Sequence, residues 1–155
     1  MTQLKLRAVW SLIIWSLVMM GICIVFFNEG GADTFLDGER RVTLTRAFIT
    51  IGFALYFLLL ILTNKRRARM KKRIKDERDE LIEKKALTTG FYVVITYVFL
   101  FSTALYAFYK VFSESALMPV GWIWFLGLSC LIVGHITIAA STLILNDRMS
   151  GYGQG

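Results

Sequence analysis

Four long runs of apolar residues are the feature that most restricts how this chain can fold. They cover residues 8–27, 43–63, 86–109 and 119–145, and a run of about 20 residues is what an α-helix needs to cross the hydrocarbon core of a bilayer. Lipid offers no hydrogen bonds to an exposed backbone, so only helices or closed barrels span it, and continuous rather than alternating runs indicate helices. The sequence therefore predicts an all-α integral membrane protein, a four-helix transmembrane bundle.

The composition favours one membrane domain. Of the 155 residues, 56% are hydrophobic and only 19% are charged, which is unusual for a water-soluble domain. We expect residues 1–149 to form the single four-span domain and the glycine-rich residues 150–155 to form a flexible tail. The first apolar run follows Lys5 and Arg7, as in a signal peptide, but it is longer than the apolar region of such a peptide, so we expect it to remain as the first span.

The basic residues predict the orientation. Of the 18 Lys and Arg residues, two precede the first run, eleven lie in the central segment at residues 64–85 and one follows the fourth run, whereas the other two connections hold four when Arg46, at the start of the second run, is counted with them. Cytoplasmic loops carry the excess of basic residues in membrane proteins. We therefore predict a multi-pass protein of the plasma (inner) membrane, with the N-terminus, the central segment and the C-terminus in the cytoplasm.

The central segment, residues 64–85, contains no Gly or Pro and consists mainly of good helix formers. The spans on either side of it run in opposite directions, so a single unbroken helix is impossible. The stretch from Lys65 to Lys75 is almost purely basic, which suits a helix C-terminus, and the acidic residues that follow suit the first turn of a new helix with Asp76 as its N-cap. We predict that helices 2 and 3 extend into a cytosolic charged hairpin.

This hairpin has two interpretations. The basic stretch from Lys65 to Lys75 can bind anionic lipid headgroups. The acidic start of the third helix can also dock a membrane or cytosolic protein partner, through Asp76, Glu77, Arg78, Asp79 and Glu80. Nucleic acid is not expected as a partner, because the segment lacks aromatic residues on which bases could stack.

The sequence DERDELIEKKA at residues 76–86 leads directly into an apolar helix. It resembles the linker motif of a family of uncharacterised small prokaryotic four-span membrane proteins. The resemblance covers these eleven residues and the overall order of the apolar runs. That family is defined by its membrane topology rather than by an activity, so the resemblance implies the four-span fold and a prokaryotic source, and no mechanism.

His135 is the only histidine and lies near the middle of the fourth run. It can act as a proton relay, as a haem ligand if a Met or a second subunit supplies the other axial position, or as a packed residue that is hydrogen-bonded to a facing helix. With Tyr97 and Thr137, it can form a polar path. Several polar residues of the other runs fall near the same depth: Ser16, Tyr56, Thr96, Tyr97 and Ser102.

Small and polar residues of the fourth run recur at helical spacing and form one stripe: Gly127, Cys130, Gly134, Thr137 and Ser141. Lipid provides no hydrophobic drive between helices, so helices gain packing energy where small residues allow a close approach. The stripe therefore predicts a helix–helix contact. That contact lies either within the chain or between two copies in a homo-oligomer.

The sequence holds no motif for catalysis, a cofactor or a metal. It has no Gly-rich phosphate loop, HExxH, G-x-S-x-G or Cys-x-x-Cys pattern. None of the four runs carries Asp, Glu, Lys or Arg near its centre, where ion-coupled transporters usually place one. We expect a non-enzymatic accessory, regulatory or assembly protein that acts through its cytosolic hairpin. The alternative is a homo-oligomeric channel or carrier for a small solute or ion, with a polar path near His135.

Overall fold

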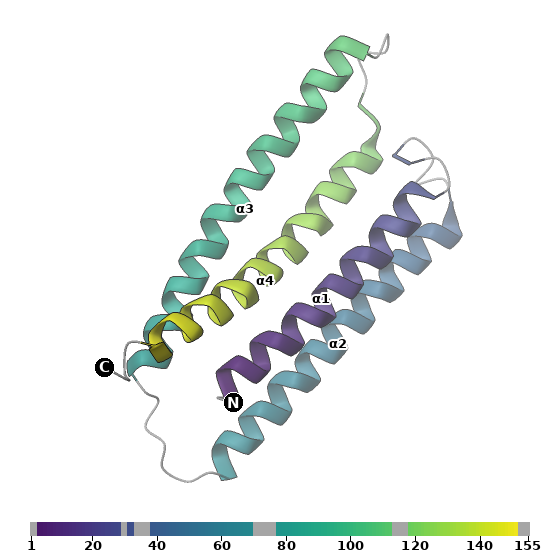
Figure 1. Ribbon diagram of the computed structural model, residues 1–155. Helices are drawn as coiled ribbons and strands as arrows, with labels where there is room; N and C mark the ends of the chain where they lie inside the picture. Colours follow the sequence, from purple (N-terminus) through teal and green to yellow (C-terminus); the bar gives the residue numbers. More distant parts are fainter. Residues whose placement is uncertain (1–2, 29–30, 33–37, 70–76, 113–117, 152–155) are drawn as a thin grey trace.

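The computed structural model describes residues 3–28, 31–32, 38–69, 77–112 and 118–151, and in residues 3, 64–69, 77, 111–112 and 150–151 it describes the backbone alone. Over these residues the chain is all-helical (Figure 1). Its helices are α1 (Gln3–Phe27), α2 (Glu39–Arg69), α3 (Glu77–Phe112) and α4 (Val120–Gly151).

Each helix is long and apolar enough to cross a membrane. The candidate spans are Leu4–Phe27, Glu39–Thr63, Arg78–Lys110 and Val120–Met149. At about 1.5 Å per residue, helices of 25 to 36 residues are longer than the roughly 30 Å of hydrocarbon that they would cross. The structure confirms the expected all-helical chain with four candidate membrane spans.

The helix ends follow local sequence signals. The carbonyl of Gly38 accepts hydrogen bonds from the backbone N–H groups of Arg41 and Val42 at the start of α2, where Glu39 also faces the positive end of the helix dipole. Helix α3 begins at Glu77, within one residue of the start expected from the acidic cluster. The predicted N-cap, Asp76, lies outside the described residues.

The helices pack in the order α2, α1, α4, α3. The packed pairs among the described residues are α1 with α2, α1 with α4 and α3 with α4, and Figure 1 shows the two central helices between the two outer ones. The start of α1, the end of α4 and the start of α3 lie at the same end of the molecule. We call it the terminal end, because both ends of the described chain lie there.

The outer helices leave most of their apolar side chains exposed. None of the apolar window of α3 and only 11% of that of α2 is buried within the chain. Exposed aromatic residues follow α3 along its length: Phe91, Tyr92, Phe99, Tyr106 and Phe108. A soluble protein rarely leaves apolar surfaces of this extent in water, so these faces agree with a chain that is surrounded by lipid.

The core lies between the two central helices. Its buried members are Trp15, Val18, Ile22 and Phe26 of α1, Ala32 of the following connection, and Phe125 and Ile132 of α4. The rings of Phe26 and Phe125 lie 4.5 Å apart between centroids, and such a pair contributes about 0.5–1.5 kcal/mol beyond the area that it buries. Helices α1 and α4 therefore form the packed centre to which α2 and α3 attach.

Glycines let α2 approach α1 closely. A Cβ atom at Gly21 of α1 would lie 2.8 Å from the ring of Phe48, and a Cβ atom at Gly52 of α2 would lie 2.7 Å from a methyl group of Val18. Each helix thus offers a glycine to a large side chain of the other. In lipid this fit supplies packing energy that the hydrophobic effect does not.

The contact of α3 with α4 repeats this exchange. A Cβ atom at Gly90 would lie 2.6 Å from Ile138, and one at Gly134 would lie 3.2 Å from Val94. Gly134 belongs to the predicted stripe of small residues, which therefore makes contact within the chain at this level. Gly127, another member of the stripe, is exposed and has no heavy atom within 4 Å of its Cβ position.

Side-chain hydrogen bonds also join α3 to α4 within the span. The hydroxyl of Tyr97 donates to Oγ of Ser129 at 2.8 Å, and Nε1 of Trp122 donates to the hydroxyl of Tyr109 at 2.9 Å. Interhelical bonds of this kind average about 0.6 kcal/mol in membranes. They fix the register of α3 against α4 more than they add to stability.

The described residues do not confirm the predicted hairpin of helices 2 and 3. Helix α2 continues past its apolar run to Arg69, and α3 begins at Glu77, well before its own run. Among the described residues α2 and α3 are not a packed pair, and α1 and α4 lie between them. The turn, at residues 70–76, lies outside the described residues, so the hairpin stays a prediction.

The start of α4 offers a test of the packing. Gly121 is buried, and a Cβ atom there would lie 2.9 Å from Cα and 3.0 Å from the carbonyl carbon of Ala32, which are backbone atoms. We expect Gly121→Ala to cost about 1–3 kcal/mol of stability, as overpacking usually does. Thermal unfolding in detergent, followed by tryptophan fluorescence, should show a lower midpoint.

Gly127→Ala is the matched control, because it adds the same methyl group to the same helix in open space. Its unfolding midpoint should be unchanged or slightly higher, since Ala favours a helix over Gly. Equal midpoints for the two variants would contradict the close approach of Ala32 to α4.

Candidate functional site

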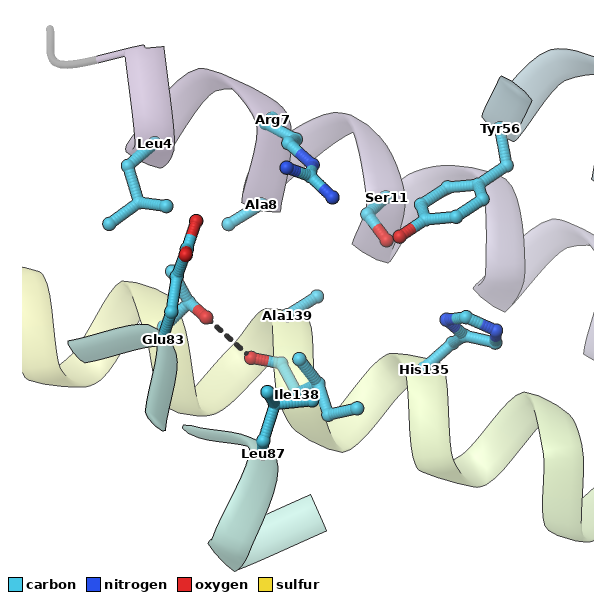
Figure 2. Close-up of a pocket in the computed structure, with 11 residues that line it drawn as sticks. Leu4, Arg7, Ala8, Ser11, Tyr56, Glu83, Leu87, His135, Ile138 and Ala139 are labelled. Carbon is cyan, nitrogen blue, oxygen red and sulfur yellow. Dashed lines mark hydrogen bonds between the residues drawn. The ribbon is translucent and has the colours of Figure 1, made fainter. Parts of the chain in front are cut away.

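A cavity of about 300 Å³ lies at the terminal end, between α1 and α3 and over α4. Its lining residues are Leu4, Arg7, Ala8 and Ser11 of α1, Tyr56 of α2, Glu83 and Leu87 of α3, and His135, Ile138, Ala139 and Thr142 of α4. Figure 2 shows these side chains converging on one space. The volume is at the lower end of the range for small-molecule sites, about 300–1,000 Å³.

Helical spacing explains why these residues share one cavity. The four lining positions of α1 and the four of α4 both follow the pattern i, i+3, i+4, i+7, which places each set on one face of its helix. Helix α3 contributes two positions that are four residues apart. Because α1 and α3 are not a packed pair among the described residues, their side chains leave space above α4.

The cavity lining carries opposite charges. Figure 2 shows the guanidinium of Arg7 directed along α1 toward Ser11, while the carboxylate of Glu83 lies beside Leu4 and Ala8, nearer the start of α1. Within the described part of the chain, Arg7 makes no hydrogen bond or ion pair. An arginine near a membrane surface commonly extends outward, whereas this one brings its charge into the cavity.

His135 stands at the inner end of the cavity, stacked on an aromatic ring. Its imidazole lies parallel to the indole of Trp15, with ring centroids 4.5 Å apart and planes inclined by 5°. Tyr56 of α2 contacts it edge-on at 5.2 Å. Trp15 is fully buried, and its Nε1 has no hydrogen-bond partner among the described residues. This cluster joins α1, α2 and α4 at one point.

The three residues of the predicted polar path do not all lie at the cavity. Of the three residues, only His135 lines the cavity. Tyr97 is bonded to Ser129 at the contact of α3 with α4, and Thr137 is partly buried on α4 but is not among the lining residues. Tyr56, which was expected at the depth of His135, does reach it, through a ring contact rather than a hydrogen bond.

Part of the acidic motif at the start of α3 makes contacts with another helix of the same chain. Arg78 donates a hydrogen bond at 3.0 Å to the backbone carbonyl of Asn146 on α4, and its Nε is buried without a partner among the described residues. Asp79 is partly buried and Glu80 is exposed. Asp76 lies outside the described residues, as does the side chain of Glu77.

Apolar burial reinforces this attachment of α3. Ile82 and Ala86 are fully buried, whereas Leu81 is 44% exposed. The first turns of α3 are therefore held at the terminal end and do not stand alone in solvent.

At the same end, Nζ of Lys5 pairs with Oδ1 of Asp147 at 2.7 Å, joining α1 to α4. Both side chains are accessible to solvent, so this pair contributes at most about 1 kcal/mol.

Comparisons with protein-family models, with curated proteins and with solved structures found no match to this chain. The resemblance carried by residues 76–86 therefore stays a prediction. Among the described residues, no group of three or more His, Cys, Asp and Glu side chains is placed to hold a metal ion. The cavity brings six polar side chains together, from all four helices: Arg7, Ser11, Tyr56, Glu83, His135 and Thr142.

Sequence reasoning does not identify four of the polar residues of this cavity: Arg7, Ser11, Glu83 and Thr142. By sequence, Arg7 is a flanking basic residue of the first run and Glu83 belongs to the charged central segment, and nothing marks Ser11 or Thr142. The signal that could have found them is the matching i, i+3, i+4, i+7 pattern on the first and fourth helices. That pattern becomes informative only once these two helices are known to be neighbours.

The stacked cluster can be tested by truncating its buried ring. Trp15→Ala removes a fully buried indole that contacts His135, Phe53 and Tyr56. Truncations of this kind cost about 3–5 kcal/mol, so we expect a large loss of stability in detergent, measured by unfolding with added SDS.

Trp10→Ala is the control, because Trp10 lies on the same helix and is 50% exposed. It should change the free energy of unfolding far less than Trp15→Ala. Similar losses for both variants would show that Trp15 does not hold the cluster together.

Proposed function

We propose that this chain is a non-enzymatic, multi-pass accessory, regulatory or assembly protein of the plasma (inner) membrane of a prokaryote. In this proposal both termini are cytoplasmic, and the terminal end of the bundle faces the cytosol. The excess of basic residues around that end supports the orientation. The stretch from Lys65 to Lys75 would bind anionic lipid headgroups there.

One observation carries the docking role: the first turns of α3 are anchored on one side and exposed on the other. The hydrogen bond from Arg78 to α4 and the burial of Ile82 hold the helix in place. Glu80, Leu81 and Lys84 are exposed on its outer side. An apolar side chain between charges on a rigid helix is a suitable contact for a protein partner, because little entropy is lost on binding.

This arrangement refines the expected docking residues. Arg78, one of the expected docking residues, also supports α3 against α4 through its hydrogen bond to Asn146. We assign the docking surface to the outer side of α3, with Glu80 and Leu81 at its centre and Lys84 one turn farther on. The partner would be a protein of the same membrane or one that is recruited to its cytosolic face.

The docking role predicts a selective effect of Glu80→Ala combined with Leu81→Ala. This variant should insert and fold as the native chain does, because the contacts of Arg78 and Ile82 that attach α3 to the bundle stay in place. It should fail to co-purify the partner that the native chain retains after mild detergent extraction from its own host. Quantitative mass spectrometry of the purified material measures the loss.

Glu39→Ala is the control, because Glu39 is an exposed glutamate in the first turn of α2, at the opposite end of the bundle. This variant should retain the partner. The accessory role would be abandoned if the native chain brings down no specific protein, or if both variants retain it equally.

The cavity favours a second candidate, a homo-oligomeric channel or carrier for a small solute or ion. It places His135, Arg7 and Glu83 in one space that begins at the terminal end and reaches a histidine well inside the span. Ionisable groups inside membrane spans often mark the route of a solute or a proton.

Flux through proteoliposomes tests this candidate. We expect His135→Ala to abolish uptake of protons or potassium, measured with a pH-sensitive dye or an ion electrode, if the route follows the cavity. Thr137→Ala should leave the flux intact, because Thr137 does not line the cavity. Absence of flux from the native chain would remove the transport candidate.

A further inference from the structure

The two charges of the cavity lie at different depths. The candidate span of α1 begins at Leu4, so the direction from Leu4 to Ser11 leads from the end of that span toward its middle. Along this direction Figure 2 shows first the carboxylate of Glu83 and then the guanidinium of Arg7. A ligand in the cavity would therefore meet a carboxylate near the surface and a guanidinium farther in.

This order matches the head group of a zwitterionic phospholipid. The phosphate of such a lipid lies next to its glycerol, and its ammonium group extends toward water. A guanidinium binds phosphate through parallel N–H bonds, and a carboxylate accepts hydrogen bonds from a primary ammonium. We propose that the cavity binds a phosphoethanolamine-type head group, with the phosphate on Arg7 and the ammonium on Glu83.

The neighbouring polar groups fit the same ligand. Figure 2 shows the hydroxyls of Ser11 and Tyr56 close together beyond the guanidinium, and each can donate to a phosphate oxygen. The hydroxyl of Thr142 already donates to the carbonyl of Ile138 at 2.8 Å, so it supplies no donor. Glu83 has an interaction of its own, but a carboxylate offers about four acceptor sites and can take the ammonium as well.

The exposure of an apolar residue in the cavity lining favours a lipid over a soluble ester as the source of this head group. Helices α1 and α3 are not a packed pair among the described residues, and Leu87, on the α3 side of the cavity, is 57% exposed. Acyl chains can therefore leave the cavity into the bilayer. A volume of about 300 Å³ accommodates a head group and not a whole phospholipid.

This proposal does not depend on the docking role of α3. It names the ligand class of the cavity on which the transport candidate rests. Binding is measured without transport, so a chain that binds the lipid but conducts nothing removes the transport candidate alone.

Lipid retention tests the proposal with the full chain. The protein is placed in nanodiscs of phosphatidylcholine that contain a minority of phosphatidylethanolamine or of phosphatidylglycerol, and native mass spectrometry measures the lipid that stays bound. The native chain should retain phosphatidylethanolamine in preference to the other two. Arg7→Gln should weaken retention at least about tenfold, the usual effect of losing a charged hydrogen bond.

Glutamine variants, each of which removes one charge, separate the binding of the ammonium group from the binding of the phosphate. Glu83→Gln should abolish the preference for ethanolamine over glycerol head groups while phosphate binding persists. Arg148→Gln removes an exposed cation from the same end of the bundle and should retain the lipid as the native chain does. Should Arg7→Gln fail to fold, Arg7→Lys and Ser11→Ala provide milder losses of the same kind.

The outcomes show whether the cavity binds this head group and whether the head group belongs to a lipid or to a soluble ester. Displacement of the lipid by soluble O-phosphoethanolamine at low concentration would support the head-group chemistry with a soluble ester as the ligand, whereas resistance to it supports the lipid. Equal retention of the three lipids by the native chain would overturn the proposal. Equal losses in Arg7→Gln and Arg148→Gln would do the same, because they would indicate only general attraction to the membrane surface.

Discussion

The close fit of side chains against glycine is the interaction on which the rest of this structure depends. Lipid tails are as apolar as the helices themselves, so burial alone gives no reason for one helix to choose another. Gly52 and Gly90 make the pairing of helices specific. Each lies so close to a branched side chain of the adjoining helix that an added Cβ atom would clash with it. The outer helices can then leave nearly all of their remaining apolar surface to the lipid, and α1 and α4 are left to form the centre.

The cavity is a consequence of this packing order. Among the described residues helix α3 packs mainly on α4, and residues of α1 and α3 line a cavity over α4. The space between them contains groups that a lipid-facing surface would not tolerate, among them Arg7 and Glu83. At its inner end the stacked pair of Trp15 and His135 closes the space. The same helix order therefore explains both the stability of the centre and the polar chemistry at its edge.

The acidic motif shows how one segment can serve structure and recognition together. Its pattern predicts a docking surface, and in the structure Arg78 and Ile82 contribute to the attachment of α3. Of the three residues between them, Glu80 and Leu81 are exposed and Asp79 is partly buried. A helix has room for both roles because residues one or two positions apart point in different directions. Sequence alone could place the motif at a helix start but could not show which of its residues pack against the bundle and which are exposed.

The apolar runs of the sequence were enough to predict an all-helical chain with four candidate membrane spans. Long continuous apolar runs have one stable form in lipid, and charge at the helix ends indicates where α3 begins to within one residue. The sequence could not determine which helices are neighbours, because any apolar face fits lipid equally well. Only the tertiary structure decided that Gly134 meets α3 while Gly127 stays open, and that His135 meets Trp15 rather than Tyr97. The candidate site depends on those neighbours, since its lining residues come from four helices that are distant in sequence.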